Sequence, residues 1–305
     1  MERSEAGRHP AGGGDARAVT LIIPIFAHAI KELIMKKTIS IVISSLLVFL
    51  VSFSACNKEE GSPSGFNLFT VNDDMAFGEE FSKEIESNPQ DYPLLDEGAF
   101  PDAYSNINRI RDSILNTGLV NYDDQFVWQV KIVQNDTVNN AFAVPGGYLY
   151  FYTGIIKFLD NEAEFAGVMG HEMAHAARRH STNQLTKAYT IQILLGIILG
   201  NNPNQLAEIA AGLASGLASL AFSRDHENDA DEWSVKYLYE TSYNPRGIRA
   251  FFEKMEGAAV PPTFMSTHPS PDNRMENIDV VWQSLGGKEG NDYMASYEAF
   301  KNSLP

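Results

Sequence analysis

Two histidines and a glutamate form the segment His171-Glu172-Met173-Ala174-His175, whose spacing could hold a metal ion. On a helix, residues four apart lie about 40° from one another around the axis, so both imidazoles project from one face. Glu172 lies on the flank of that face, where its carboxylate can take a proton from a water molecule that attacks a substrate. Catalytic zinc takes imidazole and carboxylate ligands and keeps one position open. The sequence therefore predicts one zinc ion per chain, bound by His171 and His175, with Glu172 as the general base.

A catalytic zinc site needs a third protein ligand, and two sequence patterns compete for that role. In the first pattern, a glycine three residues after the second histidine turns the chain towards a third histidine, but Arg178 and Ser181 occupy those two positions. His180 would lie on the opposite side of a continuous helix from His171, so we predict that it is a polar residue of the surface. The first pattern therefore fails.

In the second pattern the third ligand is a carboxylate on another helix, and the acidic segment Glu227-Asn228-Asp229-Ala230-Asp231 provides one. Glu227 and Asp231 are four residues apart and share a helix face. One of them can therefore bind the metal while the other accepts a hydrogen bond from a ligand imidazole. The alternative interpretation is structural, with the acidic residues stabilising the N-terminal end of the helix through its dipole.

The helix that carries the histidines is predicted over residues 161–180 and begins with a capping box formed by Asn161 and Glu164. Upstream, alternating apolar residues at 126–132 predict a half-buried strand, and residues 148–152 predict another after the turn Pro145-Gly146-Gly147. Strands that precede helices favour an α+β fold, mostly helical, with a small sheet before the active-site helix.

Further helices are predicted on both sides of this core. Residues 191–199 form an apolar stretch too short to span a membrane, and residues 206–222 include a glutamate and many small residues. We interpret both stretches as buried helices, with a membrane-dipping hairpin as the alternative. The other predicted helices cover residues 72–87, 104–114, 224–239, 245–255 and 271–285.

The N-terminal part of the chain has the outline of a secretion signal. Basic residues at 36–37 precede an uncharged apolar run, residues 38–55, which ends at Cys56, the only cysteine. Residues 53–56 resemble a bacterial lipoprotein cleavage box, so we predict lipidation of Cys56, with an uncleaved membrane anchor as the alternative. Asn57, in place of an aspartate, favours an outer-membrane lipoprotein that faces the periplasm. The predicted segments are a mis-assigned start extension (1–34), a signal peptide (35–55), a flexible tether (56–68) and a zinc-binding domain (69–305).

Composition limits the classes of partner. The chain has 305 residues, of which 44% are hydrophobic, so it can bury a sizeable core. Its formal net charge of −16 leaves no basic surface to neutralise phosphates, which argues against nucleic acid as a partner.

Five features, in order, resemble the gluzincin zinc metallopeptidases of metallopeptidase family forty-eight. That family includes the CAAX prenyl endopeptidases, the HtpX membrane proteases and the periplasmic quality-control proteases of outer-membrane assembly. The features are Asn140-Ala141-Phe142-Ala143 leading to Pro145-Gly146-Gly147, the segment His171 to His175, Ser223-Arg224, the segment Glu227 to Asp231, and Thr267-His268-Pro269. The chain has fewer clear membrane spans than the prenyl and HtpX branches, which argues against a prenylated substrate.

The resemblance implies particular roles for these residues. Glu227 is the third zinc ligand and Asp231 its orienting partner. The segment from Asn140 to Gly147 binds the substrate, and the strand after Gly147 is the sheet edge that receives an extended polypeptide. His268 stabilises the oxyanion or occupies the open zinc position of a latent enzyme, with a loop histidine of no special role as the alternative.

The function implied by the resemblance is a zinc endopeptidase that hydrolyses unfolded or misassembled proteins of the bacterial envelope. Two alternatives remain open. One is a zinc-bound chaperone or assembly lipoprotein that holds clients without cutting them, although such a protein has no need of the base Glu172. The other is a zinc amidase that acts on the cell wall.

Overall fold

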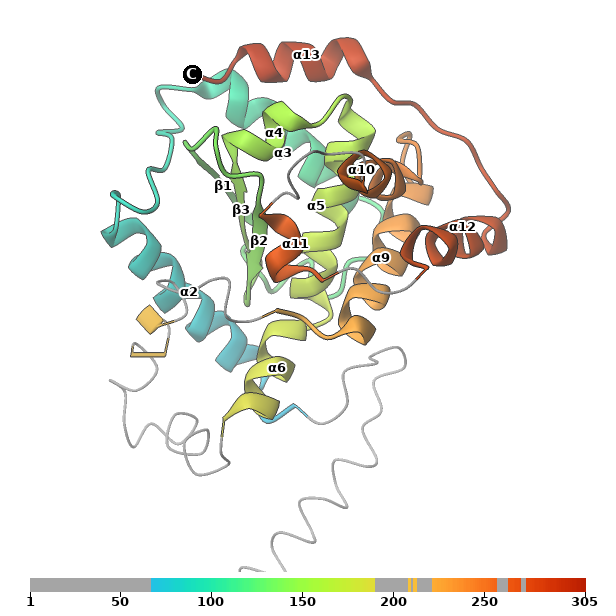
Figure 1. Cartoon of the computed structure of the whole chain (residues 1–305). Helices are drawn as coiled ribbons and strands as arrows, with labels where there is room; N and C mark the ends of the chain where they lie inside the picture. The colour runs from blue at the N-terminus through green and yellow to red at the C-terminus, as the bar shows by residue number, and fades with distance from the viewer. Residues whose placement is uncertain (1–66, 190–207, 210, 213–220, 257–262, 270–272) are drawn as a thin grey trace, which may run out of the picture. The chain divides into compact units, whose positions relative to one another are not determined.

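A computed structural model shows how these elements are arranged (Figure 1). It describes residues 67–189, 208–209, 211–212, 221–256, 263–269 and 273–305, all within one compact unit, residues 62–305. The predicted signal peptide, Cys56, nearly all of the tether, the predicted helix at 191–199 and most of the predicted helix at 206–222 lie outside the described residues.

Helices dominate the described residues, and the labels below are those of Figure 1. Two helices precede the strands, α2 (Val71–Ser87) and α3 (Pro101–Leu115), and α4 (Thr153–Phe158), α5 (Glu162–Ala177) and α6 (His180–Ala188) follow them. The later helices are α9 (Arg224–Tyr239), α10 (Gly247–Glu256), α11 (Phe264–Thr267), α12 (Arg274–Ser284) and α13 (Met294–Asn302). The strands are β1 (Gln129–Val133), β2 (Ala141–Val144) and β3 (Tyr148–Tyr152). The predicted α+β class, mostly helical with a small sheet, is confirmed.

The three strands form one sheet in the order β1-β3-β2, with β1 parallel and β2 antiparallel to β3. The prediction that the strand after Gly147 is the sheet edge is therefore wrong, because β3 is the central strand. The edges are β1 and β2, and β2, which precedes the turn at Pro145, is the edge that packs against α5. Sequence alone could not predict which strand is central, because β1 pairs with β3 although β2 lies between them in the chain.

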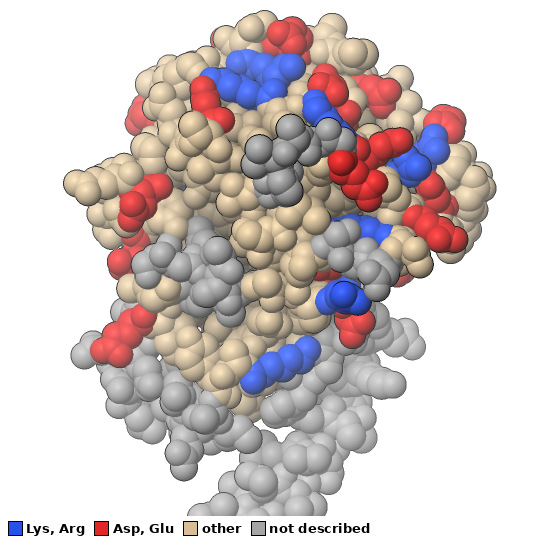
Figure 2. All heavy atoms as spheres, in the orientation of Figure 1, with Lys and Arg blue, Asp and Glu red and all other residues tan. Residues whose placement is uncertain are grey.

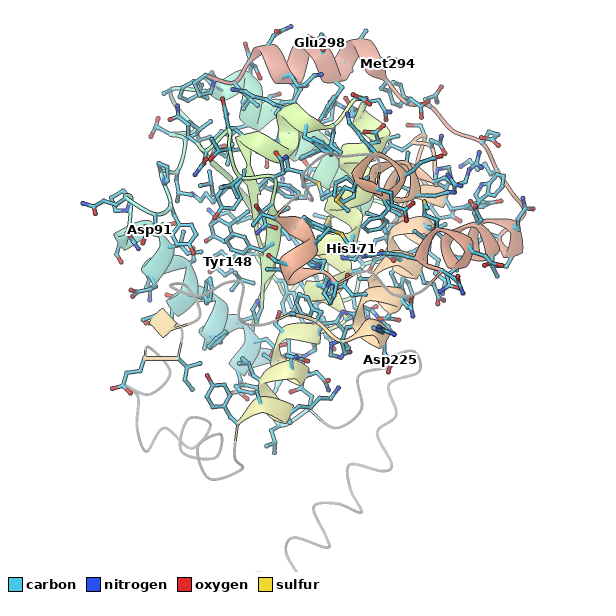
Figure 3. All side chains as sticks on the ribbon, in the orientation of Figure 1. Asp91, Tyr148, His171, Asp225, Met294 and Glu298 are labelled. Carbon is cyan, nitrogen blue, oxygen red and sulfur yellow. The ribbon has the colours of Figure 1, made fainter. Side chains whose placement is uncertain are left out.

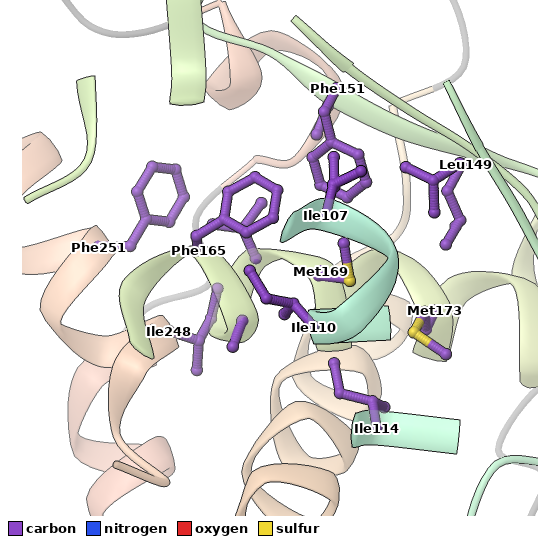
Figure 4. Close-up of a cluster of buried hydrophobic side chains, with 14 of the residues drawn as sticks. Ile107, Ile110, Ile114, Leu149, Phe151, Phe165, Met169, Met173, Ile248 and Phe251 are labelled. Atoms are coloured by element: carbon purple, nitrogen blue, oxygen red, sulfur yellow. The ribbon is translucent and has the colours of Figure 1, made fainter. Parts of the chain in front are cut away.

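The sheet separates two groups of buried apolar side chains. Successive residues of β3 point to opposite faces, so Leu149 and Phe151 pack with α3 and α5 while Tyr150 and Tyr152 pack with α2. Figure 4 shows the first group, in which Phe151 lies among side chains of α3, α5 and α10. The active-site helix is thereby held against the sheet by a continuous core.

Helix α5 lies at the centre of the fold, and every residue from Glu162 to Ala177 is buried. It begins as predicted, because the Asn161 side chain accepts a hydrogen bond from the Glu164 N–H (3.0 Å). Gly167 lets α10 approach closely, since a Cβ there would lie 2.2 Å from the backbone nitrogen of Ile248. Packing on all sides fixes the axial position of the helix, and hence of its histidines.

The predicted continuation of this helix to His180 is wrong. Helix α5 ends at Ala177, and Arg179 adopts a left-handed conformation with φ of 58°. The bend starts α6 at His180, so the helical spacing used to place His180 opposite His171 does not apply across it.

The remaining predicted helices in the described residues are found within a few residues of their expected bounds. Helix α12 begins at Arg274, and the predicted helix start at Pro271 lies outside the described residues. Among the described helices, none has the length and apolar character needed to cross a membrane.

Candidate metal centre

Four buried side chains converge where α5, α9 and the end of α11 meet. His171 and His175 come from α5, Glu227 from the first turn of α9, and His268 directly follows α11. One ligand atom from each lies within 4.8 Å of the others, the only such group among the described residues. In Figure 3, His171 lies between the ribbons of α5 and α11, and Asp225 marks the beginning of α9. The structure therefore brings the three predicted ligands, His171, His175 and Glu227, together with His268, which is 97 residues from His171 in the chain.

The separations between these atoms fit a tetrahedral zinc site. Zinc bonds of 2.0–2.2 Å place the ligand atoms about 3.3 Å apart in a tetrahedron. The Nε2 atoms of His171 and His175 are 3.0 Å apart, and they lie 3.6 Å and 3.5 Å from the carboxylate oxygens of Glu227. The Nδ1 atom of His268 lies 3.2 Å from His171 Nε2 and 3.1 Å from Glu227 Oε1. Two imidazoles and a carboxylate are also the donor set that zinc prefers.

Glu172 lies beside this cluster and supplies a second sign of metal chemistry. Its side chain is fully buried, yet neither carboxylate oxygen accepts a hydrogen bond within the described residues. His268 lies close by, with its Nε2 3.3 Å from Glu172 Oε1. A buried carboxylate without hydrogen bonds is costly, so this position is suited to an incoming water molecule.

The pKa values of the protein groups in the cluster shift in different directions. Burial raises the pKa of Glu172, an effect that the charges of His268 and His171 only partly offset. Burial also acts to raise the pKa of Glu227, but His268, His171 and Arg274 outweigh it and the pKa is lowered. Burial and the neighbouring histidines hold the pKa of His175 well below its usual range. The centre thus favours a neutral imidazole and an ionised Glu227, the forms that bind metal.

Asp231 contacts His171 on the side away from the cluster. His171 Nδ1 and Asp231 Oδ1 are 2.9 Å apart, so Nδ1 donates to the carboxylate and leaves Nε2 for a metal. Arg274 donates to both oxygens of Asp231, at 2.6 and 2.8 Å, and to Glu227 at 3.0 Å. Its guanidinium lies over the ring of Phe252, 3.6 Å from the centroid. We call His171, Asp231 and Arg274 the direct link.

His175 is supported by a histidine that we predicted to be at the surface, and that prediction is wrong. His180 is fully buried, and its Nδ1 is 3.0 Å from the Nδ1 of His175. Its Nε2 lies 3.1 Å from Asp229, which also pairs with Arg178 at 2.7 Å. The bend at Arg179 returns the chain under α5 and places His180 there. We call His175, His180, Asp229 and Arg178 the His180 link.

The edge strand β2 presents its backbone to the centre. Tyr152 N–H donates to Asn140 O, and pairs in antiparallel strands alternate between bonded and unbonded. It follows that Ala141 and Ala143 direct their N–H and C=O groups away from β3. The backbone N–H of Ala143 faces the carboxylate of Glu172 and acts to lower its pKa, although it does not meet the geometry of a hydrogen bond, so this edge lies beside the cluster.

The glycines of the turn after β2 are required for backbone conformation and close packing. Gly146 and Gly147 have φ of 79° and 88°, values that disfavour other residues. A Cβ at Gly146 would lie 3.1 Å from Met75, and one at Gly147 would lie 3.0 Å from Phe126. Of the predicted substrate-binding segment, the structure therefore places Ala143 beside Glu172 and packs Gly146 and Gly147 against α2 and the residues before β1.

Sequence reasoning missed two residues of the centre. Arg274 begins a helix far along the chain, and nothing local marks it as a partner of Glu227. His180 carried a signal, because Arg178, Arg179 and His180 together interrupt the apolar pattern of α5 three residues after the motif. A break in helical periodicity at that point would have predicted the bend.

The fold and the centre define a metallopeptidase of the class with two histidines and a glutamate as its metal-binding residues. Residues 106–281 match Peptidase family M48, more than half of the chain. The chain belongs to this family, whose members use zinc, and the predicted resemblance is confirmed.

The chain is also similar to named proteins. The Beta-barrel assembly-enhancing protease of Yersinia pestis is 25% identical over 231 residues, 71% of this chain and 45% of that protein. The Mitochondrial metalloendopeptidase OMA1 of Saccharomyces cerevisiae is 30% identical over 191 residues, 57% of this chain and 55% of that protein. The chain thus spans about half the length of the curated relatives it matches.

Proposed function

We propose that the chain is a zinc endopeptidase that cuts unfolded or misassembled polypeptides of the bacterial envelope. The observation that carries the proposal is Glu172, which is buried beside the four-residue cluster and has no hydrogen bond of its own. A base in that state is suited to a reaction that brings water to it, and peptide hydrolysis is such a reaction.

His171, His175 and Glu227 would hold the metal. Bound zinc would act as a Lewis acid that polarises the peptide carbonyl and promotes ionisation of water. Glu172 accepts a proton from the attacking water and delivers it to the departing amine.

His268 has two candidate roles. Its Nε2 lies near Glu172 and could stabilise negative charge on the carbonyl oxygen. Its Nδ1, however, lies among the ligand atoms, which favours a latent state in which His268 takes the open metal position. For a latch, replacing His268 with alanine raises proteolysis, whereas loss of an oxyanion donor lowers it about 100-fold or more.

The substrate would bind as an added strand. The outward N–H and C=O groups of Ala141 and Ala143 can pair with an extended backbone, which tolerates many sequences and requires a locally unfolded chain. The uncharged middle of the face in Figure 2, over α11, fits such a substrate, while acidic side chains gather over α10 and α12. The name of one relative, a protease that enhances β-barrel assembly, supports a role in the assembly of envelope proteins, and the name of the other, a mitochondrial metalloendopeptidase, supports endopeptidase activity.

The envelope location forms part of the proposal and rests on the sequence around Cys56. We expect radiolabelled palmitate to be incorporated into the wild type and not into Cys56→Ser, which should leave the membrane fraction. Unchanged membrane attachment of Cys56→Ser would favour an uncleaved membrane anchor instead.

The decisive experiment compares Glu172→Gln with Glu227→Ala, using unfolded casein as substrate and measuring zinc by atomic absorption. We expect Glu172→Gln to keep zinc and lose cleavage, and Glu227→Ala to lose both. Full zinc occupancy in Glu227→Ala would refute the third ligand. Envelope function that survives in Glu172→Gln would favour a chaperone, and cleavage of cell-wall fragments but not casein would favour an amidase.

A further inference from the structure

A small apolar cavity lies beside the metal centre, bounded by α2, β2, α6 and the end of α11. Its volume is about 60 Å³. The side chains that define it are mostly aromatic or aliphatic: Phe77, Phe81, Phe142, Leu185, Phe222 and His268. No aspartate, glutamate, lysine or arginine lines it among the described residues.

The cavity is continuous with the centre through two residues. His268 lines the cavity and also lies 3.3 Å from the Glu172 carboxylate. Ala143 lines the cavity too, and its outward backbone groups lie on the edge of β2. A substrate strand that pairs with β2 and places its peptide bond beside Glu172 therefore passes the mouth of the cavity.

We propose that this cavity is a subsite for one large apolar side chain of the substrate, next to the bond that is cut. This proposal rests on the proposed function. A cavity must offer about 10–15 Å³ to hold one water molecule, so this one holds the equivalent of about four to six. That is the size of a leucine, methionine or phenylalanine side chain. A charged side chain is disfavoured because the walls offer no opposite charge.

The cavity also has a residue that could restrict it. Ser181, in the first turn of α6, is small and half-buried and lines the cavity. Its replacement by phenylalanine should fill the space without removing a core side chain. Lys187→Phe is the matched control, because it adds the same ring to the exposed side of the same helix.

The first test is a map of cleavage sites in unfolded casein, read by mass spectrometry. We expect leucine, methionine and phenylalanine to be enriched at one position beside the cut. Antiparallel pairing with β2 would put that position on the amino-terminal side of the bond and parallel pairing on the other. For peptides with leucine there, Ser181→Phe should lower kcat/KM about tenfold to hundredfold and shift preference to alanine or glycine. Lys187→Phe should keep the wild-type preference.

The second test is independent of cleavage. Glu172→Gln should bind a fluorescent peptide with leucine at the enriched position at least tenfold more tightly than the same peptide with aspartate. Equal binding of the two peptides would overturn the subsite. Cleavage without apolar enrichment would also overturn the subsite, as would a folded Ser181→Phe with unchanged preference. Neither result would contradict the proposed protease function. Absence of any cleavage by both the wild type and His268→Ala would instead refute the proposed function.

Discussion

The two imidazoles of the centre are oriented in different ways. In the direct link, Asp231 contacts His171 at 2.9 Å, with no group between them. In the His180 link, a second imidazole lies between His175 and Asp229. Both carboxylates belong to α9, and each pairs with an arginine that lies over an aromatic ring, Arg274 on Phe252 and Arg178 on Trp233. Each link therefore has a ligand imidazole at one end and a carboxylate–arginine pair at the other. The two links differ only in the histidine that lies between these ends in the His180 link.

That difference determines how firmly each ring is fixed. A carboxylate only accepts hydrogen bonds, so Asp231 fixes the Nδ1–H tautomer of His171. His180 must be neutral to do the same, donating from Nε2 to Asp229 and accepting at Nδ1 from His175. Burial lowers the pKa of His180, which favours this neutral form. The direct link should therefore contribute more to metal affinity than the His180 link.

Removal of the metal should have the largest effect on activity and stability, because both links direct the Nε2 atom of a histidine to the metal position. At free zinc 1,000 times its Kd, binding contributes about 4 kcal/mol to the free energy of unfolding. We expect a chelator to abolish cleavage and to lower Tm, as measured by calorimetry. The control Glu227→Ala should show little further change with chelator. An equal Tm with and without chelator would contradict a structural contribution of the metal.

A matched pair of aspartate variants tests the comparison directly. Asp231→Asn should weaken zinc binding about 100-fold, and Asp229→Asn about tenfold, within the range for groups that orient metal ligands. The reason is that Asp231 contacts a ligand directly and shares Arg274 with Glu227. Competition with a chromophoric chelator measures both affinities. A larger loss for Asp229→Asn would reverse the ranking of the two links.

Substitution of the inserted histidine sharpens the comparison further. His180→Phe keeps the shape of the ring but removes both nitrogens, and should weaken zinc about tenfold. His180→Asn retains a polar atom near the position of Nδ1 and should recover part of that loss. The visible spectrum of a Co²⁺-substituted protein should report altered ligand geometry in His180→Phe. His226→Phe is the control, because His226 stacks on His180, 4.5 Å between centroids, without a polar contact to a ligand. If both phenylalanine variants bind zinc normally, His180 does not position His175.

A carboxylate outside both links should give the smallest effect. Burial acts to raise the pKa of Glu162, but its bonds with Arg109, Ser296 and Tyr243 lower it overall from 4.5. Its stabilising contribution is therefore present above pH 4.5 and lost as the pH falls through the lowered folded-state value. Because Arg109 is 47% exposed, this contribution should be about 1 kcal/mol. Urea unfolding should show the difference between wild type and Glu162→Gln at pH 7 disappearing in acid, and a constant difference would argue against the ion pair.

Much of the framework could be predicted because its signals are local. The capping residues of α5 and the apolar spacing of α2 and α3 lie within one or two helical turns, and the structure bears out those helices. The spacing of His171 and His175 is likewise a property of a single helix. The end of α5 was missed because the break in apolar periodicity at Arg178, Arg179 and His180 was not weighed, although a left-handed Arg179 has no sequence signal of its own. The order of the strands was missed because hydrophobic alternation shows that a strand exists and not which strands are its neighbours.

The sequence by itself determined the metal chemistry, since helical geometry alone places two imidazoles on one face and a carboxylate beside them. Tertiary structure decided what surrounds that chemistry. It placed His268 among the ligand atoms, brought Arg274 to Glu227 and Asp231, and turned His180 under His175. These contacts join residues far apart in the chain or across a bend. They depend on how α6, α9 and α12 pack around α5, which no local pattern specifies.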